Sequence, residues 1–237
     1  MHTAFVKHIP ESGSIVELEK REYDHLFKTL RCRTGEALRL CDGQGTVAEA
    51  EATADRCIKV LAKKTFEPDT VELHLFAALP KNAKLDALLK PVTEAGVKSI
   101  TPLKCRYSVA EKSEIPERWY TLLEEACKQS GNPFLPEINS TMTVAQAVDY
   151  CKANNIYIFY GAQHGTVLMP GDLPADTPLK MAWMVGPEGG FDENELALLD
   201  QAGSGITLGK YIFRLENAAL AGAAYLLTIA RQRECGK

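Results

Sequence analysis

The pattern of apolar and polar positions changes near residue 68. Before it, brief apolar or alternating stretches are separated by turn-forming residues such as Asp42-Gly43-Gln44-Gly45, which is typical of short β-strands. One helical piece near residues 22–30 interrupts this pattern. We therefore predict a small β-barrel domain over residues 1–67, with strands at 37–40, 46–48 and 57–60.

After Glu67-Pro68-Asp69, apolar strand segments alternate with helical segments. Strands that are apolar on both faces are typical of a parallel sheet covered by helices on two sides. The pattern predicts an α/β domain with a mainly parallel sheet over residues 68–237. The expected strands are 71–79, 100–103, 156–160, 181–185 and 206–208, and the expected helices are 83–95, 116–130, 143–153, 192–202 and 215–231.

Composition narrows the class of protein. With 46% hydrophobic and 24% charged residues the chain is typical of globular proteins, and it lacks the run of about 18 apolar residues that a membrane-spanning helix needs. The N-terminus MHTAFVKHIPESG has no signal-peptide core, so we expect a cytoplasmic protein without a membrane partner. Seven scattered cysteines and five dispersed histidines predict packed, reduced thiols and no metal site.

Net charge gives only weak information on nucleic-acid binding. The chain carries a formal charge of −4, which argues against binding through bulk charge alone. Basic residues nevertheless cluster in two stretches, although such runs are most often solvated surface. The two stretches contain Lys28, Arg31, Arg33 and Arg39, and Lys81, Lys84, Lys90, Lys98, Lys104 and Arg106.

A glycine loop, Gly186-Pro187-Glu188-Gly189-Gly190, follows the apolar strand 181–185 and precedes a helix. Asp192 and Glu195 have the spacing of a capping box, which places the helix start just after the loop. Ligands of α/β sheets bind beyond the carboxyl ends of the strands, and glycines let the backbone approach a flat adenine or a ribose. Taken alone, the loop is better explained as a tight turn, and it lacks the Gly-Lys-Ser/Thr ending of a phosphate loop.

A second glycine loop, Leu208-Gly209-Lys210, follows a short apolar segment and precedes the last helix. Arg214 and Glu216 stand where that helix begins. Taken alone, Glu216 is explained by the helix dipole, and Arg214 by a salt bridge to it. The joint context of the two loops, each between a strand and a helix, favours a cofactor site.

These segments resemble the RsmE-type ribosomal small-subunit RNA uridine-N3 methyltransferases of the SPOUT, or α/β-knot, superfamily. GPEGGFDENEL is similar to the family's GPEGG-x-x-x-x-E signature, and LGKYIFRLENAAL to its LG-x-x-(I/V)-LR-(T)-E-T-A signature. Upstream, His25-Leu26-x-x-x-Leu30-Arg31, Gly35 and Asp42-Gly43-x-Gly45 resemble its PUA-like barrel. Further matches fall in the family's order at Lys81, Lys90, Glu94, Gly96-Val97, Pro102, Arg106, Arg118-Trp119, Glu125-Ala126, Gln129-Ser130 and Pro136.

The resemblance implies a PUA-like, RNA-binding β-barrel over residues 1–67 and a SPOUT methyltransferase domain over 68–237. In that superfamily the C-terminal chain forms a deep trefoil knot, an exception to the rule that folds are unknotted. It also implies a homodimer, S-adenosyl-L-methionine as cofactor, and 16S rRNA or the small ribosomal subunit as partner. The cofactor-binding residues implied are Val185, Gly186, Pro187, Glu188, Gly189, Gly190, Leu208, Gly209, Ile212, Phe213 and Ala218.

The same resemblance suggests roles for individual side chains. Arg214 is expected to stabilise the negative charge that develops on the uridine carbonyl oxygens as N3 loses its proton. Glu216 either accepts that proton or orients Arg214, and orientation is the preferred reading because a lone exposed carboxylate is a weak base. The expected RNA-binding residues are Lys28, Arg31 and Arg33 of the barrel, and Lys81, Lys90 and Arg106.

Four residues depart from the family pattern. Leu215 and Asn217 replace threonines, Asn132 replaces an arginine, and Pro91 is expected to bend its helix. Two rival functions stay open: a related knotted methyltransferase acting on a ribose 2′-OH or on tRNA, and a catalytically inactive RNA-binding ribosome assembly factor. Binding of S-adenosylmethionine would argue against the inactive factor. A phosphate-loop hydrolase is disfavoured because its lysine and magnesium ligands are missing.

Overall fold

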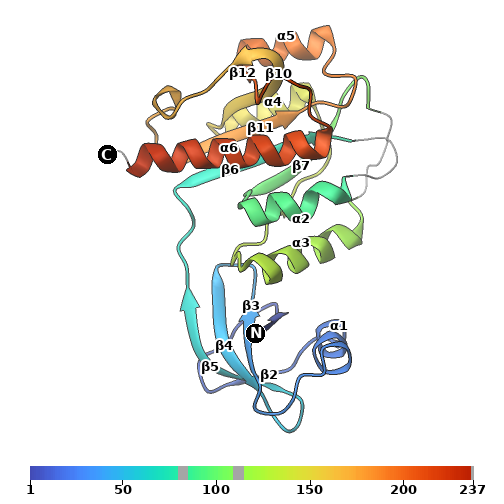
Figure 1. Ribbon diagram of the computed structural model, residues 1–237, viewed down its shortest axis with the longest axis vertical. Coiled ribbons are helices and arrows are strands. Elements are labelled where there is room, and N and C mark those ends of the chain that lie inside the picture. The colour runs from blue at the N-terminus through green and yellow to red at the C-terminus, as the bar shows by residue number, and fades with distance from the viewer. Residues whose placement is uncertain (80–84, 109–114, 236–237) are drawn as a thin grey trace. The chain divides into compact units, whose positions relative to one another are not determined.

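The computed structural model describes residues 1–79, 85–108 and 115–235 (Figure 1). The chain divides into two compact units. The first unit contains Met1–Pro68 together with Leu123–Leu135, and the second contains Asp69–Leu122 and the chain from Pro136 onward. Each unit has its own sheet, so each is described separately.

The first unit is built on a five-stranded sheet in the order β1-β3-β4-β5-β2. The first pair, β1 and β3, is parallel, and the other pairs are antiparallel. Alternate side chains of these strands enclose a core with Leu26, which lies in a helical segment after β2. A PUA-like barrel stays a prediction for this unit. Its elements are β1 (His2–Phe5), β2 (Ile15–Val16), α1 (Lys20–Tyr23), the π-helix η1 (Asp24–Thr29), β3 (Ala37–Cys41), β4 (Thr46–Ala52) and β5 (Ile58–Thr65).

The segment Leu123–Leu135, which the sequence places in the second region, contacts the first unit. It includes the end of α3 (Glu117–Ser130). Lys128 Nζ lies 2.7 Å from Glu22 Oε1, and both side chains are almost fully buried. A β-bridge also joins Phe134 to Gln44. An amphipathic pattern shows which face of a helix is apolar but does not show which domain covers that face.

The second unit is built on a sheet in the order β12-β10-β11-β6-β7-β8, with β9 paired to β7. Every pairing described in this sheet is parallel, which confirms the predicted mainly parallel sheet. Its strands are β6 (Val71–Ala78), β7 (Ser99–Lys104), β8 (Glu137–Ile138), β9 (Met142–Thr143), β10 (Tyr157–Thr166), β11 (Leu179–Val185) and β12 (Gly203–Ile206).

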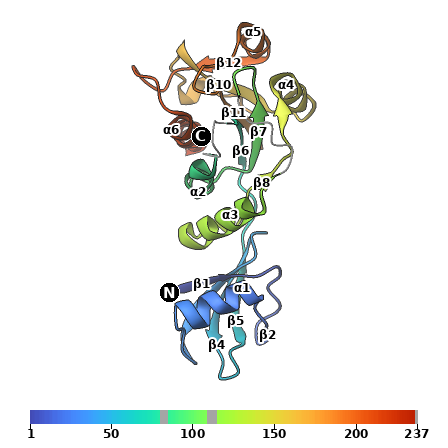
Figure 2. The same cartoon turned by 90° about the vertical axis from the view of Figure 1, so that its right-hand side faces the viewer.

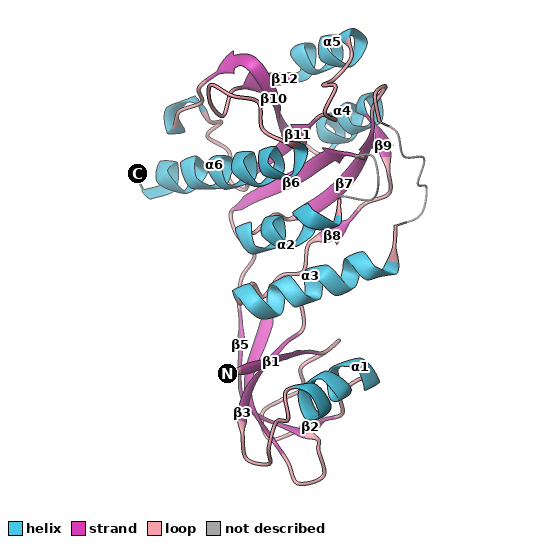
Figure 3. Cartoon of the chain, turned by 45° about the vertical axis from the view of Figure 1, so that its right-hand side comes forward, coloured by secondary structure: helices cyan, strands magenta, loops and turns pink. Residues whose placement is uncertain are grey.

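Helices cover both faces of this sheet (Figures 2 and 3). On one face, α2 (Asp86–Ala95) and α6 (Leu215–Cys235) pack together, and α6 lies over β6 and β11. On the other face lie α4 (Val144–Ala153) and α5 (Glu193–Ala202). The α2 helix continues through Pro91 to Ala95. A short 3-10 helix, η3 (Pro170–Asp172), lies in the connection from β10 to β11 and contacts α6. The C-terminal trefoil knot stays a prediction.

The prediction of a strand at residues 206–208 is wrong. The strand β12 is Gly203–Ile206, and Thr207 and Leu208 already belong to the following loop. The sequence pattern favoured Ile-Thr-Leu over Gly-Ser-Gly because glycine is unfavourable in strands. Here β12 runs so close to β10 that a Cβ atom at Gly203 would overlap with Ile158, and one at Gly205 would lie 2.9 Å from the Tyr160 hydroxyl. Close strand approach therefore requires these glycines.

His74 on β6 is expected to make the stability of the second unit depend on pH. Burial lowers its pKa, and nearby Glu72 opposes this shift only partly. An unfolded histidine titrates near pH ~6.5, so below that pH the unfolded state binds a proton that the folded state rejects. The free energy of unfolding should therefore decrease as the pH falls from about 7.5 to about 5.5.

Urea unfolding at both pH values checks this, with His74→Gln expected to have a flatter pH dependence than the wild type. His164 is exposed, so His164→Gln serves as the matched control and should keep the wild-type dependence. Equal pH dependence in the wild type and His74→Gln would contradict the assignment.

Candidate functional site

The two glycine loops lie at the same edge of the parallel sheet. The first follows β11 and the second follows β12, and β10 lies between these two strands. Because all these strands run in one direction, their carboxyl ends meet at one edge. This edge is where α/β sheets bind ligands.

The first loop is a tight turn with an exposed tip. Val185 and Pro187 are buried, whereas Glu188 and Gly189 are exposed. The Gly190 N–H donates to the Pro187 carbonyl over 2.8 Å, and Gly190 has a φ of +76°. A Cβ atom at Gly186 would lie 3.2 Å from the Phe191 ring, so this glycine lets the ring pack against the backbone.

The predicted capping box after this loop is confirmed. The Asp192 side chain accepts from the Glu195 N–H over 2.8 Å, and Glu195 Oε2 accepts from the Asp192 N–H over 2.9 Å. This reciprocal pair satisfies two backbone donors at the start of α5. The loop is therefore fixed on one side by β11 and on the other by a capped helix.

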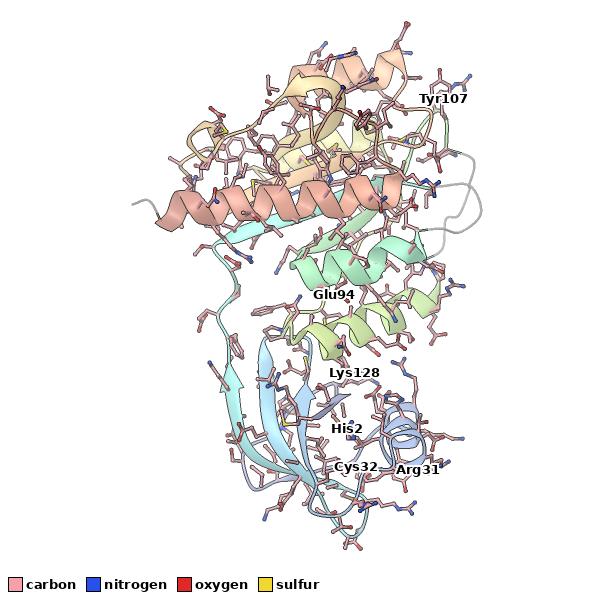
Figure 4. All side chains as sticks on the ribbon, in the orientation of Figure 1. His2, Arg31, Cys32, Glu94, Tyr107 and Lys128 are labelled. Carbon is pink, nitrogen blue, oxygen red and sulfur yellow. The ribbon has the colours of Figure 1, made fainter. Side chains whose placement is uncertain are left out.

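Tyr107, which sequence reasoning did not name, lies beside this loop. Residues 105–108 follow β7, and the Tyr107 side chain is close to Gly189, where an added Cβ atom would meet the Tyr107 Cβ at 3.4 Å. Arg106 N–H donates to Glu195 Oε1 over 2.8 Å. Tyr107 is 56% exposed, and Figure 4 labels it. The sequence signal that could have identified Tyr107 is its position directly after Arg106, in the second basic stretch.

The second loop presents exposed apolar side chains. Tyr211 and Ile212 are 78% and 79% exposed, and Phe213 is 44% exposed. The loop begins where the Thr207 N–H donates to the Thr166 carbonyl over 3.0 Å, which ties it to the end of β10. Leu208 and Ala218 are partly buried, and Gly209 is exposed.

Arg214 and Glu216 flank the start of α6. Arg214 is exposed, Glu216 is partly buried, and the Arg214 carbonyl accepts from the Ala218 N–H over 2.8 Å. Both residues belong to the described part of the chain, and no ion pair joins them there. The neighbouring Leu215 is buried, so this departure from the family pattern places an apolar side chain in the core.

Trp183 connects the strand before the first loop with the helix after the second. It is fully buried on β11, and its Nε1–H donates to the Ala218 carbonyl of α6 over 3.0 Å. A Cβ atom at Gly222 would overlap with the indole ring. The ring therefore lies directly against the α6 backbone, one turn after Ala218. The sequence pattern identified Trp183 only as part of an apolar strand.

The expected RNA-binding residues are distributed over both units. In the first unit Lys28, Arg31 and Arg33 are exposed, and Lys28 Nζ lies 2.7 Å from Asp24. Arg31 has a φ of +57°, a left-handed conformation that is costly for a residue other than glycine. In the second unit Arg106 is exposed and Lys90 is partly buried on α2, while Lys81 lies outside the described residues.

Asn132 has a structural role near the first unit's sheet. Its side-chain oxygen accepts from the Phe134 N–H over 3.0 Å, and its carbonyl faces the Cys41 thiol. This Asx-type turn accounts for an asparagine at a position where the family has arginine. The Asn217 side chain is exposed, and nothing in the structure explains that departure.

In the part of the chain that the structure describes, the cysteines and the possible metal-ligating groups form no second candidate site. Among the cysteines whose side chains are described, all but Cys57 are buried, as expected for packed thiols. Burial raises the pKa of Cys105, Cys127 and Cys151 to about 12. Over the described residues, no His, Cys, Asp or Glu group has the arrangement of a metal site, and no helix is long and apolar enough to cross a membrane.

Comparisons with known proteins agree on one family. A family model described as an RNA methyltransferase domain matches residues 67–227. The ribosomal RNA small subunit methyltransferases E of Rickettsia conorii and Synechocystis are 29% and 26% identical to this chain. The alignments cover 90% and 89% of this chain, and 89% and 72% of those proteins.

A solved structure gives a similar result over nearly the whole chain. The ribosomal RNA small subunit methyltransferase E of Neisseria gonorrhoeae, bound to S-adenosyl methionine, has a TM-score of 0.85 and 25% identity. The similarity covers 97% of this chain and 98% of that one. A Porphyromonas gingivalis protein with a TM-score of 0.82 and 23% identity has the same fold.

Proposed function

The chain belongs to the RNA methyltransferase family whose model matches residues 67–227, and from this premise we propose that it methylates N3 of one uridine in 16S rRNA. The observation that carries the proposal is near-complete similarity to a methyltransferase bound to S-adenosyl methionine. The uridine-N3 target rests on the resemblance of the two loop signatures to that class of enzyme.

The two loops fit S-adenosyl-L-methionine as cofactor. The exposed tip at Glu188 and Gly189 offers backbone donors and acceptors without a Cβ obstacle at the glycine. The exposed Ile212 and Phe213 offer apolar surface for an adenine ring. We assign cofactor binding to Val185, Gly186, Pro187, Glu188, Gly189, Gly190, Leu208, Gly209, Ile212, Phe213 and Ala218.

The proposed methyl transfer requires the protein to bind cofactor and RNA and to stabilise the charge that develops on the uridine. When bound, the cofactor supplies an electrophilic methyl group on its sulfonium. The protein must then hold uridine N3 in line with it and stabilise the charge left when N3 loses its proton to solvent water. We assign this stabilisation to the Arg214 guanidinium, which donates hydrogen bonds to a uridine carbonyl oxygen. We assign Glu216, in the first turn of α6, the role of orienting Arg214 once substrate is present.

A direct test is transfer of labelled methyl from S-adenosylmethionine to ribosomal RNA extracted from cells that lack the gene. The methylated nucleoside is then identified by mass spectrometry and mapped on the 16S sequence. We expect N3-methyluridine at one position. A 2′-O-methyl or tRNA product would favour the related knotted methyltransferase. No binding of S-adenosylmethionine, together with no transfer to any RNA, would favour the assembly factor.

The first unit is proposed to bind the RNA backbone as a PUA-like barrel. Replacing Lys28, Arg31 and Arg33 together by glutamine should lower the affinity for ribosomal RNA and flatten its salt dependence. Each lost phosphate contact should reduce the slope of log K against log salt by about 0.7 for single-stranded RNA. Titrations at several salt concentrations measure this.

The matched control replaces three exposed lysines on strand β5 of the same unit by glutamine, namely Lys59, Lys63 and Lys64. An equal loss of salt dependence in the control would show that bulk charge, and not the predicted residues, binds the RNA.

We also propose, from the same resemblance, a homodimer and a C-terminal trefoil knot. Sedimentation analysis tests the dimer. The helix α6 contacts η3, and its Tyr225 hydroxyl donates to the carbonyl of Leu168, just before η3. These contacts support a close association of the β10–β11 connection with α6.

A further inference from the structure

The backbone around Tyr107 is fixed by three hydrogen bonds. Ser108 N–H donates to the Cys105 carbonyl over 3.0 Å, and Cys105 N–H donates to Ser108 Oγ over 3.1 Å. Arg106 N–H donates to Glu195, the same carboxylate that caps α5 after the first glycine loop. The turn that carries Tyr107 is therefore held beside that loop by the protein's own hydrogen bonds.

The Tyr107 ring lies against the loop but is largely open to solvent. An added Cβ atom at Gly189 would lie 3.5 Å from Tyr107 Cδ2 and 3.6 Å from Cγ, so the ring is in contact range of the loop backbone. More than half of the residue is nevertheless exposed. Covering a flat aromatic surface with another flat ring would remove apolar area from water.

The charged neighbours of Tyr107 indicate what kind of ligand ring would stack on it. Lys104 and Arg106 are exposed, while Cys105 between them is buried. An aromatic side chain beside cations is the arrangement by which proteins bind single-stranded nucleic acid, because the cations attract phosphates and the ring stacks on a base. These cations would not attract S-adenosylmethionine to the Tyr107 ring, because the sulfonium of that cofactor is itself positively charged.

We propose that Tyr107 is a stacking platform for a nucleobase of the single-stranded RNA substrate, next to the cofactor loop. This inference rests on the proposed function, since it requires an RNA substrate at this edge of the sheet. Tyr107 contacts the substrate and takes no part in proton transfer.

The test compares Tyr107→Ala, Tyr107→Leu and Tyr107→Phe in the full chain. Phenylalanine keeps the aromatic face, whereas leucine keeps apolar volume without it. Tyr120→Ala is the matched control, because Tyr120 is also an exposed tyrosine but lies elsewhere, on α3. The measurements are the Kd for deproteinised small-subunit ribosomal RNA, kcat/KM for methyl transfer to that RNA, the Kd for S-adenosylmethionine by calorimetry, and the thermal midpoint.

We expect the alanine and leucine variants to lose roughly 5- to 100-fold in RNA affinity and in kcat/KM, as for one lost base-stacking contact. The phenylalanine and Tyr120→Ala variants should stay within about twofold of the wild type, and all variants should bind S-adenosylmethionine normally with unchanged thermal midpoints.

Three results would overturn the proposal. The first is unchanged RNA affinity in Tyr107→Ala. The second is a Tyr107→Leu variant that equals the phenylalanine variant, because volume alone would then suffice. The third is weaker cofactor binding in Tyr107→Ala with normal RNA affinity, which would assign the ring to the cofactor. If the wild type transfers no methyl group to RNA, the proposed function itself fails, and this result is visible before any variant is compared.

Discussion

Replacing Arg214 by alanine is expected to lower kcat by roughly 100- to 1,000-fold, the usual cost of losing a donor to developing negative charge. The Kd for S-adenosylmethionine should remain that of the wild type, because the exposed guanidinium lies after the loop backbone that we assign to the cofactor. Single-turnover methyl transfer with saturating RNA measures kcat, and calorimetry measures cofactor binding.

Two further variants separate this role from a general effect of charge. Lys210→Ala removes an exposed cation from the same loop and should leave kcat within a fewfold of the wild type. Arg214→Lys keeps the charge but loses the planar fork of donors, so it should recover only part of the rate. If Arg214→Ala turned over normally while cofactor still bound, the assignment of charge stabilisation would be wrong.

Replacing Gly222 by alanine is expected to destabilise the protein by about 3 kcal/mol, the upper range for overpacking a rigid core. The new Cβ atom would overlap with the indole of Trp183, which is fully buried and held by its hydrogen bond to the Ala218 carbonyl. Urea unfolding measures the loss, and weaker cofactor binding should accompany it because α6 follows the second loop directly.

A double-mutant cycle identifies the cause of this loss. Trp183→Leu leaves space beside the helix, so Gly222→Ala should cost much less in that background than in the wild type. Gly171→Ala is the control, because an added Cβ atom there meets nothing within 4 Å. Equal costs of Gly222→Ala in both backgrounds would show that the overlap with Trp183 is not responsible.

The sequence was most informative where a local pattern has one structural solution. Long apolar strands could only form a parallel sheet covered on both sides, and Asp192 and Glu195 could be placed as a capping box without knowledge of distant residues. The strand β12 was misplaced because its glycines are explained only by its close approach to β10.

Long-range contacts account for the site residues that the sequence did not indicate. Tyr107 and Gly189 are more than 80 positions apart, and only the order of strands in the sheet brings them together. Trp183 was visible as a core residue, but its role depends on the absence of a side chain at Gly222. Arg214 and Glu216 were found through the resemblance of their motif, since their local pattern is equally explained by the helix dipole.

The position of α6 determines when the site can form during protein synthesis. Strand β6 pairs with β11 more than 100 residues later, and α6, which follows both strands in sequence, packs over them and accepts the Trp183 hydrogen bond. Until that helix has left the ribosome, the second loop has no helix to close it and Trp183 has no partner. A nascent chain would therefore complete the proposed cofactor site only once α6 has been synthesised, long after β6 and the first unit's sheet.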